Sequence, residues 1–458
     1  MLGYVGHDEL RVVPIARFPN TPVQTLDGMH WNILELYRNI TVGLASAARQ
    51  EPDVRSIGVD SWAVDYALIS GKRMLGNPYH YRDGRNELAV ERAHQTRSFE
   101  QLYQANGLQF LPFTTMYQLI AEQSGGWLER ADSLLLIPDL INFWLTGERA
   151  AERTNASTTG LVNIHTQDWD SELMDAFGLP RSIFPELIDP GAVVGSLERG
   201  VANSLGFRHD ATVTAVGSHD TASAVVAVPA LTENFAYISS GTWSLVGVEL
   251  EHPVISAESM AANFTNEGGV DNRVRFLKNV SGLWLLSESI RTWEGEDSAR
   301  LELGPLLKQA AELQGSIPIF DAADPAFISP GDMPRRIAEW CTERGMRPPQ
   351  TRAQFVRSIL ESLATAYADA LVQAAALSGR RIDVIHIVGG GSQNELLCQL
   401  TADKAGTPVV AGPVEATALG NVLVQARSQG LISGSLEALR SRVAVGTTLR
   451  RFTPSTRR

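Results

Sequence analysis

The stretch that decides the fold is Val384–Val410, VIHIVGGGSQNELLCQLTADKAGTPVV. A β-branched apolar run is followed by three glycines and by a helix-forming segment that Ser392 can cap. Gly406 can end this helix in a left-handed conformation, and a second β-branched run follows at once. Strand, helix and strand in this order form a βαβ unit, which is typical of α/β proteins. The sequence therefore predicts an α/β fold.

The three glycines of this unit, Gly389–Gly391, would let a flat ligand approach the backbone. No Gly-Lys-Ser/Thr follows, so the loop is not of the Walker type. It is an imperfect GxGxxG, because Asn394 stands where the third glycine belongs. Glu415 follows at the distance of a ribose-binding acid, so a dinucleotide site stays open, although that fingerprint normally opens its domain. A glycine-rich turn without a ligand explains the residues equally well.

The composition describes a chain that can bury more than one core. It has 458 residues, of which 44% are hydrophobic, and a formal net charge of −12. Its length suggests about two or three domains. We place a boundary within Val228–Glu233, which gives domains 1–230 and 231–458. The negative charge argues against nucleic acid or an anionic membrane as the main partner.

Cysteine usage and hydropathy indicate a soluble, cytoplasmic protein. Cys341 and Cys398 are the only cysteines, which fits a reducing compartment and leaves open whether they pair. Neither has neighbours at metal-ligand spacing, so we expect no structural zinc site. The most apolar stretch, LLLIPDLINFWL, is interrupted by polar residues and is too short to span a bilayer.

A second strand-to-helix bend carries an aspartate. In AVGSHDTASAV, residues 215–225, an apolar strand ends at Gly217 and an alanine-rich helix begins near Asp220. Ligands of open α/β sheets bind at the carboxyl ends of strands, and a helix N-terminus favours an ionised carboxylate. Asp220 is therefore a candidate base for removing a hydroxyl proton. The same pattern is also typical of an ordinary helix cap.

The segment AYISSGTWSLVGVEL, residues 236–250, predicts a tight hairpin. Apolar and polar residues alternate on both sides of its Ser-Gly-Thr turn, as they do in two paired strands. The turn offers backbone N–H groups and hydroxyls to phosphate oxygens. A plain hairpin turn without a ligand explains it as well.

Two other segments predict secondary structure without pointing to chemistry. SIGVDSWAVDYALIS, residues 56–70, indicates two strands or one long bent strand. A long helix is predicted to begin near Thr351, where Thr351 and Gln354 make a capping-box pair, and to end at Gly379.

Five motifs in chain order resemble those of the FGGY carbohydrate kinases: GSHDTASA, SSGTW, KNVSGLWLL, GGGSQN and GPVEATALGN. The resemblance covers nearly all of the chain and includes GVDSWAVDYALI and NASTTGLVNIHTQDWDSELMDAFGLP. It implies two actin-like (ribonuclease H-like) α/β domains around a central cleft, the first binding mainly sugar and the second mainly ATP. HDTASA, SSGTWSL and LKNVSGLW are most similar to the members that phosphorylate L-rhamnulose at O1.

The resemblance also implies the residues that bind the sugar. Asp220 would be the general base that takes a proton from the primary hydroxyl of the sugar. His219 and Thr221 would flank the sugar, and Ala63 would lie against it. Asn279 would bind it by hydrogen bonds.

For the nucleotide, the resemblance implies three contacts. Thr242 would address the ATP phosphates, and Gly390 would border the adenine. Ser287 stands at an ATP-contacting position where family members usually have a glutamine. Mg²⁺ is expected on the ATP phosphates, where it would keep several waters and need no ligand cage made only of protein.

Family members usually open with a strand and a turn of the type Asp-Leu-Gly-Ala-Ser-Ser-Gly-Arg, and this sequence begins just beyond it. We therefore expect the first strand and its phosphate loop to be missing, and the chain to be a poor kinase. Two alternatives stay open. One is an inactive sugar- or nucleotide-binding protein of the same fold, and the other is a nucleotide-dependent oxidoreductase built on VGGGSQN.

Overall fold

The computed structural model describes residues 1–6, 8–207 and 211–455. The chain divides into two compact units, and each is described by itself. Unit 1 comprises Met1–Ala227, Glu249–Phe276 and Ala416–Gly446; unit 2 comprises Val228–Val248, Leu277–Glu415 and Thr447–Arg458. Two segments from the second half of the sequence are thus grouped with unit 1.

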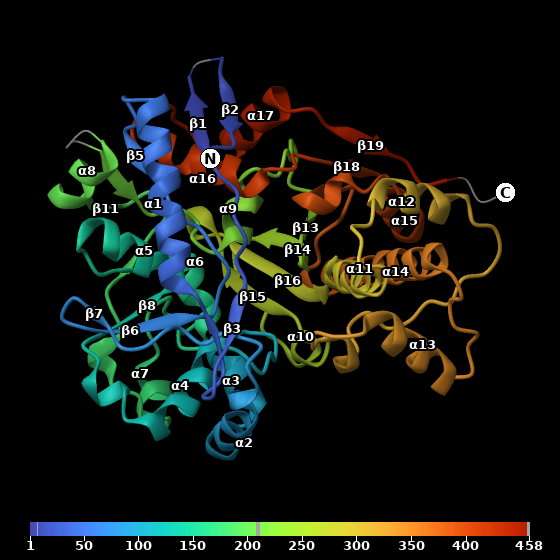
Figure 1. The fold of residues 1–458 in the computed structure, drawn as a ribbon, viewed down its shortest axis with the longest axis horizontal. Coiled ribbons are helices and arrows are strands. Elements are labelled where there is room, and N and C mark those ends of the chain that lie inside the picture. Colours follow the sequence, from blue (N-terminus) through green and yellow to red (C-terminus); the bar gives the residue numbers. More distant parts are fainter. Residues whose placement is uncertain (7, 208–210, 456–458) are drawn as a thin grey trace. The chain divides into compact units, whose positions relative to one another are not determined.

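Helices and strands alternate along the chain, which confirms the predicted α/β class (Figure 1). In unit 1 the elements are β1 (Leu2–Val5), β2 (Leu10–Val13), β3 (Pro22–Gln24), β4 (Met29–Trp31), α1 (Ile33–Gln50), β5 (Ser56–Ile57), β6 (Tyr66–Ser70), β7 (Arg73–Met74), α2 (Glu87–Thr96), α3 (Phe99–Asn106), α4 (Thr115–Glu122), β8 (Ser133–Leu136), α5 (Ile137–Thr146), β9 (Ala151–Glu152), α6 (Arg153–Ala156), α7 (Ser171–Ala176), β10 (Leu187–Ile188), β11 (Val193–Ser196), α8 (Arg199–Leu205), β12 (Thr212–Thr214), α9 (Asp220–Val226), α10 (Ala257–Ala261), β15 (Thr265–Gly268), α16 (Ala416–Ser428) and α17 (Leu436–Gly446). Most of unit 2 is formed by β13 (Phe235–Ser240), β14 (Trp243–Leu250), β16 (Val274–Ser281), α11 (Trp284–Asp297), α12 (Leu303–Glu312), α13 (Met333–Glu343), α14 (Arg352–Ser378), β17 (Val384–Val388), α15 (Glu395–Ala405), β18 (Val409–Ala411) and β19 (Arg450–Phe452).

Unit 1 contains a three-stranded sheet in the order β11-β12-β5. β5 and β12 are parallel, with Ser56 opposite Thr212 and Ile57 opposite Val213. Parallel strands end at the same edge of a sheet, so the chain segments after β5 and after β12 emerge side by side. This edge carries the candidate site residues of unit 1.

The segment SIGVDSWAVDYALIS forms two strands rather than one bent strand. β5 lies in the sheet just described, whereas β6 belongs to a separate sheet with the order β7-β6-β8. Between the two strands, Val64 has a positive φ of 67°. A β-branched residue rarely adopts this conformation, so the chain turns sharply here instead of continuing as a strand.

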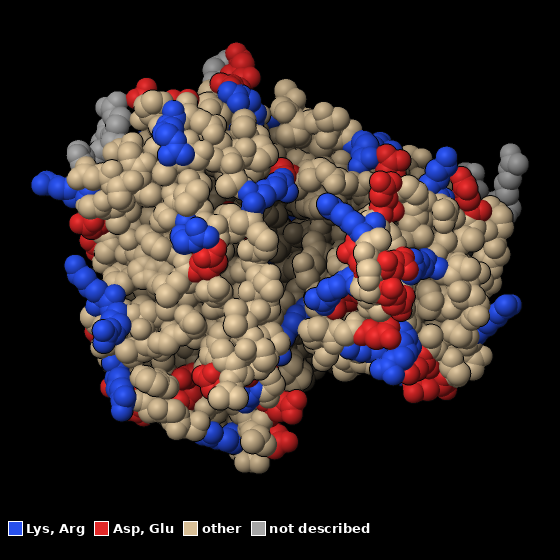
Figure 2. Space-filling model, in the orientation of Figure 1, with Lys and Arg blue, Asp and Glu red and all other residues tan. Residues whose placement is uncertain are grey.

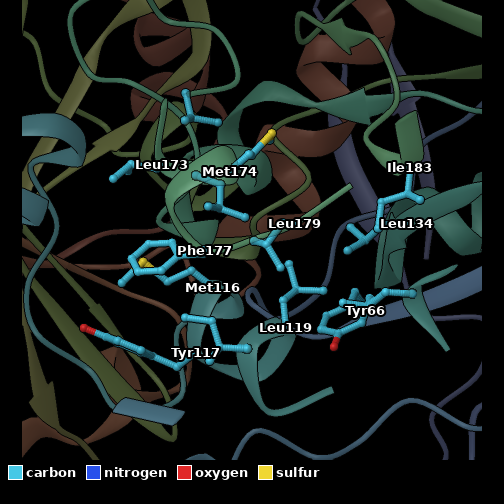
Figure 3. Packing of buried hydrophobic residues seen from close by; sticks show 14 of the residues in the cluster. Tyr66, Met116, Tyr117, Leu119, Leu134, Leu173, Met174, Phe177, Leu179 and Ile183 are labelled. Carbon is cyan, nitrogen blue, oxygen red and sulfur yellow. The ribbon is translucent and has the colours of Figure 1, made fainter. Parts of the chain in front are cut away.

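An apolar core anchors β6 and the helices around it (Figure 3). Tyr66 of β6 lies opposite Leu136 of β8 in an antiparallel pair, and both side chains are buried. Burying one large apolar side chain contributes roughly 1.5–3 kcal/mol. This cluster therefore fixes the chain that follows the segment 58–65. Figure 3 labels ten of its members: Tyr66, Met116, Tyr117, Leu119, Leu134, Leu173, Met174, Phe177, Leu179 and Ile183.

In unit 2, the predicted βαβ unit is confirmed as β17, α15 and β18, with the two strands parallel. Gly406 ends α15 with a left-handed φ of 62°. The predicted cap is wrong, because Asn394 accepts from Leu397 N at 3.1 Å. Ser392 lies in a short 3₁₀ turn, where its hydroxyl donates to Gly389 O at 2.7 Å. The helix therefore begins later than predicted.

The long predicted helix is α14, which packs against α15 (Figure 1). The Thr351 side chain caps its start by accepting from Gln354 N at 3.3 Å, and Gly379 ends it in a left-handed conformation. Gln354 Oε1 accepts from Gln350 N at 2.7 Å, so the reciprocal half of the capping box goes to the residue before the cap.

Three further features of the structure concern its thiols, its hydropathy and its surface charge. Cys341 and Cys398 are both buried and free, so they do not pair with each other. Among the described residues, no helix combines the length and apolar character needed to cross a membrane. On the face drawn in Figure 2, Lys and Arg are interspersed with Asp and Glu rather than gathered in a basic patch.

Candidate functional site

Asp220 is the first residue of α9, in the turn that follows β12. Its side chain is 49% exposed, and Oδ1 accepts a hydrogen bond from Thr221 Oγ1 at 3.0 Å. His219 occupies the cap position before it and makes no capping hydrogen bond through its side chain. The structure thus does not support the alternative in which Asp220 is an ordinary helix cap.

The segment after β5 lies directly against this turn. Ser61 N donates to Ser218 O, and Asp220 N donates to Ser61 O, both at 2.9 Å. Ala63 follows two residues after Ser61. Unit 1 therefore brings Ala63 and the turn 219–221 to the same sheet edge.

Asp60 belongs to the same edge, and the sequence patterns above do not single it out. Asn421 of α16 donates from Nδ2 to Asp60 Oδ2 and, at 3.2 Å, to Gly58 O. Burial raises the pKa of Asp60 to about 7; the Asn421 hydrogen bond opposes this rise, and the Asp220 carboxylate adds to it. The sequence signal that could have found Asp60 is its position, because it follows strand β5 just as Asp220 follows the parallel strand β12.

Asp60→Asn is expected to change how stability depends on pH. The pKa of Asp60 is about 7 in the folded state and ordinarily 3.8. The folded state therefore binds this proton more tightly than the unfolded state. The stability contributed by the proton is full below about pH 4 and is lost as the pH rises through 7. Asparagine imitates the protonated carboxyl at every pH.

We compare the free energy of unfolding of the Asn variant with that of the parent. We expect the difference between them to shift in favour of the variant by about 2 kcal/mol from pH 4 to pH 8. This is roughly half of what the full pKa shift would supply, because Asp60 is partly exposed. Urea denaturation of both proteins at the two pH values measures the difference. An equal difference at pH 4 and pH 8 would refute this account of Asp60.

A buried carboxylate holds the turn that precedes Asp220. Glu152 is fully buried, and its Oε2 accepts from Ser218 Oγ at 2.6 Å and from Ser218 N at 3.0 Å. The same oxygen accepts from Thr154 Oγ1 at 2.6 Å. Burial raises the pKa of Glu152, and these hydrogen bonds oppose the rise. The residues just before NASTTG, which begins at Asn155, therefore support the geometry of the Asp220 turn.

In unit 2, backbone hydrogen bonds join the turn that contains Thr242 to the start of the helix that contains Ser287. Gly241 and Thr242 lie in the tight turn between antiparallel β13 and β14, which confirms the predicted hairpin. Leu283 N donates to Gly241 O at 3.0 Å, and Trp284 N donates to Thr242 O at 3.2 Å. Ser287 N donates to Leu283 O at 2.8 Å, so its exposed side chain lies at the first turn of α11.

The three glycines after β17 have different surroundings. A Cβ at Gly389 would lie 3.0 Å from Ser240 O, and one at Gly391 would overlap the Ser240 hydroxyl. A Cβ at Gly390 would meet no atom within 4 Å. Two of the glycines are thus required for packing against β13, and only Gly390 leaves open space. Because β13 and β17 are parallel neighbours, Gly390 and the Thr242 turn share a sheet edge.

Asn279 lies on β16 in unit 2 and is half-buried. Its neighbour Lys278 donates to Gln373 Oε1 at 3.5 Å, and burial lowers the pKa of that lysine. The role of Asn279 toward a sugar rests on the resemblance and remains a prediction.

Comparison with known families matches both halves of the chain. The N-terminal domain of the FGGY family of carbohydrate kinases matches residues 15–227, and its C-terminal domain matches residues 236–429.

Individual relatives agree with the family match. Rhamnulokinase of Bacteroides thetaiotaomicron is 42% identical over 94% of this chain and 88% of the relative. Rhamnulokinase of Enterococcus faecalis is 39% identical over 93% of this chain and 86% of the relative.

Solved structures share the fold at low sequence identity. A xylulose kinase from Lactobacillus acidophilus has a TM-score of 0.77 and 16% identity, over 95% of this chain and 88% of that chain. Plasmodium falciparum glycerol kinase with ADP has a TM-score of 0.76 and 16% identity, over 98% and 90%. The expected two-domain kinase fold is therefore confirmed.

Proposed function

This chain belongs to the FGGY family of carbohydrate kinases, and on that premise we propose that it transfers the terminal phosphate of ATP to O1 of L-rhamnulose. The observation that carries the choice of substrate is the identity of about 40% to proteins named rhamnulokinase, over more than nine-tenths of this chain. The half-exposed Asp220 carboxylate at the sheet edge supports the choice of reaction.

In this proposal, Asp220 takes the proton of the sugar O1 hydroxyl as that oxygen attacks the terminal phosphorus of ATP. The bond between this phosphorus and its bridging oxygen breaks, and ADP leaves with the electron pair. Thr221 orients the carboxylate through its hydrogen bond to Oδ1. His219 and the small Ala63 side chain border the sugar at the same edge.

We assign the sugar mainly to domain 1–230 and ATP mainly to domain 231–458. Three candidate nucleotide contacts, Thr242, Ser287 and Gly390, all lie in unit 2. The exposed hydroxyl of Thr242 and the N–H groups of its turn suit phosphate oxygens, and Gly390 leaves space for a flat ring. Mg²⁺ would neutralise charge on the phosphates and keep several waters, so these contacts need no carboxylate cage.

The other interpretations lose support. An inactive binding protein is not favoured, because the named relatives are kinases and the candidate base is present at the sheet edge. An oxidoreductase built on VGGGSQN is not supported either, since the family match over residues 236–429 includes that loop.

Asn279→Ala is expected to weaken sugar binding by about 1–3 kcal/mol, because a polar group of the sugar would lose its partner in a half-buried site. Calorimetric titration with L-rhamnulose should show this loss, while ATP affinity measured without sugar should barely change. Equal losses for sugar and ATP would mean that the substitution acts through the fold of unit 2.

A panel of ketoses in a coupled ADP-release assay tests the proposed function. We expect L-rhamnulose to have the highest kcat/KM, above xylulose, ribulose and fructose. ADP release that does not depend on any sugar, or a clear preference for another ketose, would overturn the proposed substrate.

A further inference from the structure

A buried arginine contacts the histidine beside Asp220. Arg275 of β16 has no exposed side-chain surface, although it carries a permanent charge. Its Nη2 lies 3.1 Å from His219 Nδ1, and its Nε donates to Gly268 O at 2.8 Å. All of these residues belong to unit 1.

The contact restricts the position of the hydrogen on His219. A guanidinium can only donate hydrogen bonds, so His219 Nδ1 must accept from Arg275 and cannot carry a hydrogen. In the neutral imidazole the hydrogen then lies on Nε2. Nε2 is 3.7 Å from Asp220 Oδ1, so it lies on the side of the ring that faces the candidate base.

A carboxylate favours the opposite tautomer. Glu267 Oε2 lies 3.3 Å from the same His219 Nδ1 and would accept a hydrogen from it. However, the Arg275 contact is shorter, and Arg275 Nη1 also lies 3.1 Å from Glu267 Oε2. The arginine therefore faces the carboxylate oxygen as an ion pair, without a hydrogen bond between these two atoms, and takes the ring nitrogen as its acceptor.

We propose that Arg275 is a positioning residue that keeps hydrogen off His219 Nδ1, so that the ring carries its hydrogen on Nε2, beside Asp220. At 3.7 Å, the Nε2 to Oδ1 distance is longer than a hydrogen bond. A substrate hydroxyl placed between them can accept from His219 Nε2 and donate to Asp220, which aligns its proton with the base. In the other tautomer, Nε2 would be an acceptor and could not donate to this hydroxyl. This kinetic consequence rests on the proposed function, whereas the tautomer does not.

The tautomer can be read directly in the unliganded protein. Nitrogen-15 NMR of the histidine-labelled full chain at pH 8 distinguishes Nδ1 from Nε2 hydrogens, and a His219→Asn variant identifies the signals of His219. We expect the hydrogen on Nε2 in the parent and in Arg275→Lys, which keeps a donor. In Arg275→Met, we expect it on Nδ1, directed at Glu267. A hydrogen on Nδ1 in the parent would overturn the proposal without any variant.

The kinetics at pH 8 test the consequence for catalysis. Without Arg275, Glu267 can hold the ring hydrogen on Nδ1, and Nε2 then has no hydrogen to donate to the substrate hydroxyl. At pH 8, Arg275→Met should therefore lose about tenfold in ketose kcat/KM relative to the parent, with the KM for ATP unchanged. Arg275→Lys should restore most of the parent value.

Arg440→Met is the matched control. Arg440 is also a buried arginine of unit 1, and it pairs with Glu249 at 2.7 and 2.8 Å. Its loss should lower the melting temperature while leaving the ketose kcat/KM at pH 8 unchanged. A ketose kcat/KM of Arg275→Met equal to that of the parent would contradict the proposal. If the parent did not phosphorylate L-rhamnulose, the proposed function would fail, and the NMR result would still decide the tautomer.

Discussion

Asp220→Asn is expected to lower kcat by roughly a hundredfold or more, which is the effect of losing a general base. The amide keeps the shape of the carboxylate and can still accept from Thr221 Oγ1, but it cannot take a proton at neutral pH. The fold and ATP affinity should therefore stay close to those of the parent. Initial rates of ADP release with saturating L-rhamnulose, together with calorimetric titration of ATP, measure both parts.

Asp132→Asn supplies the control for this substitution. Asp132 lies in the same unit, is 50% exposed, and pairs with Arg149 at 2.8 Å on the surface. Such a pair contributes little, about 0–1 kcal/mol, so kcat should remain within a few-fold of the parent. A similar kcat for both variants and the parent would remove Asp220 from the role of base.

Gly420→Ala is expected to produce the largest loss of stability. α16 crosses α9 with backbone close to backbone, and a Cβ at Gly420 would overlap the Ser223 carbonyl oxygen. It would also lie 3.2 Å from Val226 Cβ. Because a backbone oxygen cannot rotate away as a side chain can, the helices must separate. We expect the free energy of unfolding to fall by about 3 kcal/mol, at the upper end for overpacking.

Gly295→Ala is the control, at a helical position where a Cβ atom has room. Gly295 lies within α11, where an added Cβ would meet no atom within 4 Å. Alanine there should stabilise the protein by about 0.5–1 kcal/mol, as in any helix interior. Urea denaturation followed by circular dichroism compares the two variants. Stability of Gly420→Ala equal to the parent would show that the two helices can move apart freely.

Local patterns made much of the fold predictable. The βαβ unit at 384–410, the hairpin at 236–250 and the helix from Thr351 to Gly379 are each specified by neighbouring residues, and the structure confirms them. The predicted cap of α15, Ser392, is wrong by two residues. The 3₁₀ turn at Gly390–Gln393 precedes the helix, so Asn394 caps it instead. Periodicity alone does not reveal such a turn.

Contacts between distant parts of the chain were not predictable in this way. Asn421 reaches Asp60 across 361 positions, and Arg275 reaches His219 across 56. Each contact depends on how separate strands and helices pack, and one sequence read by local pattern carries no information on that packing. The family resemblance supplied Asp220 and its neighbours, but it did not supply Asp60 or Arg275.

The identity of the product tests the central claim most directly. The parent protein, ATP, Mg²⁺ and L-rhamnulose should yield a sugar phosphate whose proton-coupled phosphorus-31 NMR signal is a triplet. A triplet arises because phosphorus on O1 couples to the two hydrogens of the C1 methylene group. A doublet, which would place the phosphate on a secondary hydroxyl, or inorganic phosphate as the only new signal, would contradict the account.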